Sequence, residues 1–212
     1  MKHWWLTGCF WWFAMPCYSW GFYAHERINE LAVFLLPPEL LQFYKSHLSF
    51  LVQHAVDPDK RRYVVVQEGA RHFIDLDHYG VYPFTQLPRN WTEAVSRYSA
   101  DTLQRYGLLP WWIPRMEQNL TEAFRAKNVY QILKLSAEIG HYLSDAHVPL
   151  HTTSNHNGQL TGQTGIHGFW ESRVPELLAA EWNFFLPAVC YIPSPQAYIW
   201  DRIFESTAEV DS

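Results

Sequence analysis

Apolar residues recur at helical spacing along most of this chain, and proline or glycine marks where several of these runs stop. The run over residues 21–36 has one apolar face and ends at Pro37, and a second predicted helix covers residues 39–52. Alternating strand patterns are scarce, and residues 63–66 form the one β-rich run. We therefore predict a single all-α domain, a multi-helix bundle whose further helices span residues 91–106, 114–126, 129–147, 166–182 and 197–210.

Composition sets limits on the protein class. A length of 212 residues fits one domain, and 48% hydrophobic with 17% charged residues permits a sizeable core and excludes wholesale disorder. The net charge of −5 offers no basic surplus for non-specific nucleic-acid binding. Three cysteines are too few for a disulfide framework.

The N-terminus is free of Asp, Glu, Lys and Arg from His3 to Tyr23. Lys2 followed by this apolar stretch indicates a secretory signal peptide over residues 1–19, cleaved before Trp20. The alternative is an N-terminal membrane anchor, because residues 4–23 are nearly long enough to span a bilayer. Cleavage predicts a secreted or periplasmic protein whose mature domain covers residues 20–212.

Histidine is the unusual part of the composition, with eleven copies. His141 and Asp145 are four apart on a predicted helix, so both project from one face, and His151 follows in the next loop. His167 and Glu171 repeat the same spacing. One such pair is more often a surface or capping pair, but two pairs with His151 between them favour a metal site. Imidazole and carboxylate without thiolate suit catalytic zinc.

Two other stretches are ambiguous by themselves. The charged run from Asp57 to Arg62, followed by His72, fits either a functional site or a turn with solvated charges. After cleavage, the α-amine and carbonyl of Trp20 are able to chelate a metal together with His25, although an aromatic and a histidine at a helix start are ordinarily packing residues.

Together these motifs, over residues 20 to about 185, resemble the trinuclear-zinc superfamily of bacterial phospholipase C and the single-strand-specific zinc nucleases of the S-one/P-one type. The resemblance implies an all-α fold with three zinc ions. It places one ion at Asp57, His72, His141 and Asp145, a second at His151, His167 and Glu171, and a third at Trp20, His25 and the shared Asp145.

The resemblance also implies a phosphodiester hydrolase in which a hydroxide held by zinc attacks phosphorus. Asp57 is then expected to orient or deprotonate the attacking water, and Lys60 to supply positive charge to the phosphate. Lys60 stands where the nucleases carry arginine. Glu171 resembles the phospholipase branch, whereas the step of five residues from Trp20 to His25 resembles the nuclease branch.

Three functions stay open from the sequence. The first is a phosphodiesterase acting on phospholipid head groups, and the second is a nuclease acting on single-stranded nucleic acid. The third is an exported zinc-binding protein without turnover, because the chain ends soon after Val210, where the resemblance implies more helices, so C-terminal truncation is part of this hypothesis. No obligate protein partner is evident, and a monomer is expected.

Overall fold

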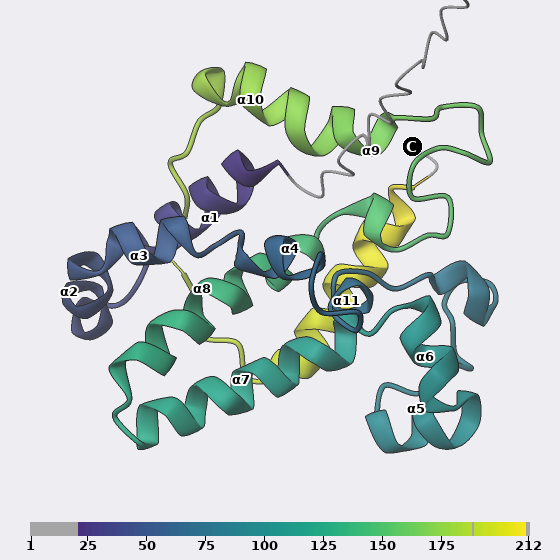
Figure 1. The fold of residues 1–212 in the computed structure, drawn as a ribbon, viewed down its shortest axis with the longest axis horizontal. Coiled ribbons are helices and arrows are strands. Elements are labelled where there is room, and N and C mark those ends of the chain that lie inside the picture. Colours follow the sequence, from purple (N-terminus) through teal and green to yellow (C-terminus); the bar gives the residue numbers. More distant parts are fainter. Residues whose placement is uncertain (1–20, 188, 211–212) are drawn as a thin grey trace, which may run out of the picture.

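The computed structural model describes residues 21–187 and 189–210, and these residues form helices joined by turns and loops, with no strand among them (Figure 1). This confirms the predicted all-α single domain. The predicted signal peptide and Trp20 lie outside the described residues. The α-helices in chain order are α1 (Phe22–Phe34), α2 (Pro38–Ser46), α3 (Leu48–Gln53), α4 (Asp57–Arg61), α5 (Trp91–Tyr98), α6 (Ala100–Tyr106), α7 (Leu109–Arg125), α8 (Val129–Asp145), α9 (Ile166–Gly168), α10 (Val174–Leu178) and α11 (Pro195–Ala208).

Short 3₁₀ and π-helical turns connect some of these helices. A π-helical turn, η4 (Phe169–Arg173), joins α9 to α10 so that they continue one another. The 3₁₀ turns are η1 (Gly69–Arg71), η2 (Leu76–Tyr79), η3 (Pro149–His151) and η5 (Ala179–Glu181).

The structure divides two of the predicted helices. The helix expected over residues 39–52 breaks at His47, between α2 and α3. The helix expected over residues 91–106 breaks at Ser99, whose φ of 69° ends α5 and whose side chain accepts a hydrogen bond from Thr102 N at the start of α6.

Two other sequence expectations differ from the structure. The helix expected to begin at Pro114 begins five residues earlier, at Leu109, because Pro110 already occupies the first turn and Pro114 removes only one backbone hydrogen bond. The β-rich run over residues 63–66 lies in turns, where Tyr63, Val64 and Val66 are strongly exposed. A short apolar run without a partner strand has no ladder to join.

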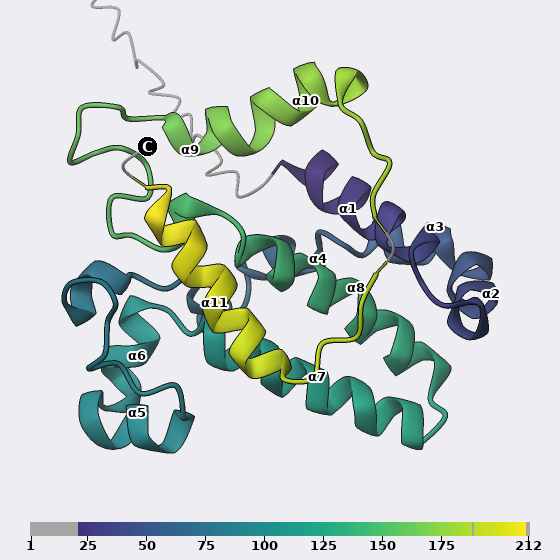
Figure 2. The same cartoon turned by 180° about the vertical axis from the view of Figure 1, so that it is seen from behind.

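Helix α8 is the centre of the molecule. It packs along α7, and α1, α3 and α4 also contact it, while α11 lies across α7 (Figure 2). The N-terminal half of α8 packs in an apolar core with α1, α2 and α3, and its C-terminal half packs in a second core with α6, α7 and α11. Two cores of buried apolar surface therefore fix α8 at both ends.

A glycine lets α1 approach α8 closely. A Cβ atom at Gly140 would lie only 2.0 Å from Oδ1 of Asn29 on α1. The amide of Asn29 uses this space to donate to the carbonyl oxygens of Ala137 at 3.0 Å and Leu51 at 3.3 Å. The close contact brings His25, one turn earlier on α1, beside the C-terminal end of α8.

None of the helices in the described part of the chain is long and apolar enough to cross a membrane.

Candidate metal centre

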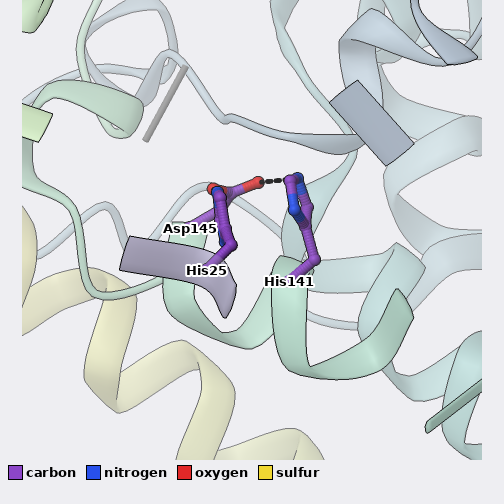
Figure 3. Close-up of side chains that lie close together, drawn as sticks. All are labelled: His25, His141 and Asp145. Atoms are coloured by element: carbon purple, nitrogen blue, oxygen red, sulfur yellow. Dashed lines mark ion pairs between the residues drawn. The ribbon is translucent and has the colours of Figure 1, made fainter. Parts of the chain in front are cut away.

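Histidine and carboxylate side chains from distant parts of the chain converge at the C-terminal end of α8. Three groups of them have potential ligand atoms within 4.8 Å of one another. The groups are His25, His141 and Asp145 (Figure 3); Asp59, His72 and His141; and His151, His167 and Glu171.

Asp145 connects all three groups. It is fully buried, and its Oδ2 lies 3.0 Å from Nδ1 of His72 and 3.4 Å from Nε2 of His141. Its Oδ1 lies 3.6 Å from Nε2 of His25 and 3.6 Å from Nδ1 of His151. The predicted pair on one helix face is therefore present, and its carboxylate faces a different set of histidines with each oxygen.

Two of the buried rings are held so that Nε2 faces the cluster. Nδ1 of His141 donates to the carbonyl oxygen of Ala55 at 2.9 Å. Nδ1 of His25 donates to Oγ of Ser144 at 2.8 Å, because the Ser144 hydroxyl itself donates to the carbonyl of His141. The two rings stack with centroids 3.7 Å apart. Such hydrogen bonds on the far nitrogen fix the tautomer of metal-binding histidines.

The third group lies where α9 passes into its π-helical turn. Nε2 of His167 is 2.9 Å from Oε2 of Glu171, and Nε2 of His151 is 3.2 Å from Oε1. Nδ1 of His167 donates to the carbonyl of His156 at 2.8 Å. The backbone amide of Gly21 donates to the carbonyl of Glu171 at 3.0 Å, so the first described residue lies beside this group. π-Helical turns occur frequently at functional sites.

The structure places Asp57 outside the cluster and puts Asp59 there instead. Asp57 lies at the surface with its side chain 34% exposed and its Oδ2 2.5 Å from Nδ1 of His54. Asp59 is buried, and its Oδ1 lies 3.8 Å from both His72 and His141. The reason is helical geometry: residues two apart in α4 point in directions about 200° apart, so only one of the two faces α8.

Lys60 points to the surface. Its side chain is 55% exposed, and its ammonium lies 3.8 Å from Oδ1 of Asp57 and over the ring of Phe22 at 5.6 Å. His147, which lies between Asp145 and His151 in the sequence, is exposed, and its Nδ1 donates to the carbonyl of Leu143.

The charges of the cluster fit a bound cation. Burial, together with the nearby Asp59 and Glu171, raises the pKa of the Asp145 carboxyl well above its usual value. Burial also lowers the pKa values of His25, His72 and His141 far below normal, which keeps these rings neutral and able to bind metal.

Buried polar atoms without hydrogen-bond partners also fit a bound cation. Among the described residues, Oδ1 of Asp145 and Nδ1 of His151 are buried without a hydrogen-bond partner although they face each other. Buried polar atoms are rarely left so. Neutral imidazoles and carboxylates without thiolate are the ligand set of catalytic zinc, so the residues present fit zinc.

Sequence reasoning missed some residues that shape this centre. Asp59 lies in the same charged run as Asp57. Knowing which of the two faces α8 on its helix would have identified Asp59, but the sequence alone does not give that. Ser144 and the Ala55 carbonyl, which orient His25 and His141, carry no motif that would have identified them.

Comparison with known proteins shows that the chain matches a protein family. The family model described as zinc-dependent phospholipase C matches residues 24–210, nearly the whole chain. No curated protein matches the chain. The family match identifies the chain as a zinc hydrolase that acts on phosphate ester bonds, in agreement with the resemblance seen in the sequence.

Proposed function

We propose that this chain, which belongs to the zinc-dependent phospholipase C family, is an exported phosphodiesterase that holds three zinc ions and acts on phospholipid head groups. The observation that carries the proposal is the carboxylate of Asp145, whose two oxygens face separate histidine groups. A buried carboxylate placed in this way is suited to link neighbouring metal ions.

We assign the ligands of each ion from the contacts within the cluster. One ion takes Asp59, His72, His141 and Asp145, and the second takes His151, His167 and Glu171. The third takes His25, Asp145 and the α-amine of Trp20. Trp20 lies outside the described residues, but the hydrogen bond from its neighbour Gly21 to Glu171 supports this assignment.

Bound zinc would supply Lewis acidity at the phosphate oxygens and lower the pKa of water toward about 7. The chain's own residues then have separate tasks. Asp59 is the carboxylate best placed to orient an attacking water and to accept its proton, the role that the sequence had given to Asp57. Lys60, one residue later and exposed, supplies positive charge to an anionic phosphodiester, as one ammonium without the fork of arginine.

An assay with three substrates tests this function. Purified protein is incubated with bis(p-nitrophenyl) phosphate, phosphatidylcholine vesicles and single-stranded DNA, each with and without a chelator. We expect chelator-sensitive cleavage of the first two and release of diacylglycerol from the second. Cleavage of DNA with intact phosphatidylcholine would identify the nuclease alternative. Bound zinc with no cleavage of any substrate would identify a non-catalytic zinc-binding protein.

Export has a separate test. N-terminal sequencing of the protein recovered outside the cytoplasm should begin at Trp20 and read Trp-Gly-Phe-Tyr. An intact Met1 would support the membrane-anchor alternative and would remove the α-amine ligand from the third ion.

A further inference from the structure

Glu68 is a fully buried carboxylate behind the metal centre, and four side chains surround it. Its Oε2 accepts from Nε of Arg61 at 2.9 Å and from Arg71 at 2.5 Å. Its Oε1 accepts from Nη2 of Arg61 at 3.1 Å and from the hydroxyl of Tyr142 on α8. Two guanidinium groups and one hydroxyl therefore donate to the Glu68 carboxylate and hold both of its oxygens in place.

The fourth neighbour of Glu68 is His72. Nε2 of His72 is buried, has no hydrogen-bond partner among the described residues and faces Oε1 of Glu68 at 3.8 Å. The other nitrogen, Nδ1, lies 3.0 Å from Asp145 and 3.1 Å from Nε2 of His141. His72 therefore has its carboxylate neighbours on opposite sides of the ring, the ligand Asp145 at one nitrogen and Glu68 at the other.

This orientation is the reverse of the one found at the other anchored rings. His25, His141 and His167 each use Nδ1 for a hydrogen bond to a protein oxygen and turn Nε2 to the cluster. His72 turns Nδ1 to the cluster instead. A ring in that orientation needs an acceptor at Nε2, because only the deprotonated nitrogen binds metal and the hydrogen must reside on the other.

We propose that Glu68 is a positioning residue for His72, and that in the zinc-loaded protein its carboxylate accepts the Nε2 hydrogen so that Nδ1 binds the ion. The inference rests on the zinc site proposed above at Asp59, His72, His141 and Asp145. It also gives a role to Arg61 and Arg71 of the charged run, which hold Glu68 rather than contacting a substrate.

A pair of matched variants distinguishes this positioning role from a purely structural role of the buried carboxylates around Arg61. Glu138 is a second buried carboxylate that binds Arg61, at 2.7 Å from Nη1, and among the described residues it forms ion pairs with Arg61 and Lys134 rather than with a histidine. Glu68→Gln and Glu138→Gln each remove one buried charge from the same arginine. Zinc content after dialysis and competitive zinc titration are measured for both variants and for wild type.

We expect Glu68→Gln to lose one ion relative to wild type or to bind it at least about 10-fold more weakly, as is typical when the partner of a ligand histidine is changed. Glu138→Gln should keep the full zinc content. Equal zinc loss in the two variants, or none in Glu68→Gln, would overturn the role of Glu68 while leaving the zinc site standing. A wild type that binds no zinc would overturn both.

A measurement on wild type decides the matter even where Glu68→Gln does not fold. Long-range ¹H–¹⁵N spectra of zinc-loaded protein labelled at histidine report which ring nitrogen carries the hydrogen, and His72→Gln identifies the signal of His72. We expect a hydrogen on Nε2 and zinc on Nδ1 for this ring. A His72 ring with zinc on Nε2 would overturn the proposal.

Discussion

The metal centre has two halves that the fold supports differently. The inner group, Asp59, His72 and His141, is buried between α4 and α8 and is backed by the Arg61 and Glu68 network. The outer group, His151, His167 and Glu171, lies at η3 and the α9 segment, and the side chain of His167 is 15% exposed. Asp145 stands between the groups and contacts both.

The halves also differ in how their charges are balanced without metal. In the inner part of the centre, burial keeps His72 and His141 neutral and also raises the pKa of the Asp145 carboxyl, which favours its uncharged form. In the outer group, the pKa of Glu171 falls to about 2 despite its burial, because His151 and His167 stabilise the carboxylate. Against the effect of burial, Glu171 raises the pKa of His167. Without metal, the inner residues therefore favour their neutral forms, whereas the outer group contains an ion pair.

The largest effect should come from removing Asp145, which lies between the two halves. Asp145→Ala takes a ligand from the inner ion and from the ion at His25, so we expect these two ions to be lost and phosphodiesterase activity to fall to that of chelated wild type. Zinc content by mass spectrometry and hydrolysis of bis(p-nitrophenyl) phosphate measure the two outcomes. Full activity with residual zinc in this variant would contradict the assignment.

The second prediction compares two aspartates of α4. Asp59→Asn should weaken binding of the inner ion by more than the roughly 10–100-fold that changes around a ligand usually cost. Asp57→Asn removes only partly exposed pairs with His54 and Lys60 and should change the free energy of unfolding by less than about 1 kcal/mol. Zinc titration and denaturant unfolding check both variants. If Asp57→Asn lost zinc and Asp59→Asn did not, Asp57 rather than Asp59 would be the ligand, as the sequence analysis expected.

This pair of aspartates shows what the sequence could and could not predict. Helical spacing is local, so the pairs His141 with Asp145 and His167 with Glu171 were predictable and lie as expected. Whether Asp57 or Asp59 faces α8 depends on where a five-residue helix begins. The number of residues between these aspartates and His72 does not determine that. The acceptors behind the rings, such as the Ala55 carbonyl, come from tertiary packing and have no sequence signature.

The third prediction removes one ligand of the outer group. His167→Gln should release the outer ion and leave the inner ion bound, because His167 pairs with Glu171, hydrogen-bonds to His156 and stacks on His151, away from the inner ligands. Zinc content should fall by one ion relative to wild type. Loss of every ion would show that the two halves bind zinc as one unit and would contradict the distinction between them.

The smallest effect concerns the metal-free protein and its pH dependence. Because the pKa of His167 is raised in the folded state, its stabilising pair with Glu171 is present below the unfolded histidine value of about 6.5 and is lost as pH rises through the folded value. Because the pKa of Glu171 is lowered to about 2, the same pair weakens below about pH 4.3.

His167→Gln should therefore destabilise chelated protein most between about pH 4.3 and 6.5, by about 2 kcal/mol, and less at higher pH. Urea unfolding of both proteins in chelator at a series of pH values measures this difference. A difference that grows above pH 7 would contradict the ion pair in the outer group.

The central claim is that Asp145 joins the inner zinc site to the ion at His25, next to a separate outer site. A crystal structure of the zinc-loaded protein with anomalous data at the zinc edge tests it most directly. We predict separate anomalous peaks at the inner and outer groups, with Asp59 rather than Asp57 at the inner ion and Asp145 bound through one oxygen to the inner ion and through the other to the ion at His25. Peaks that leave Asp145 without a metal contact, or no peak in the cluster, would contradict the account.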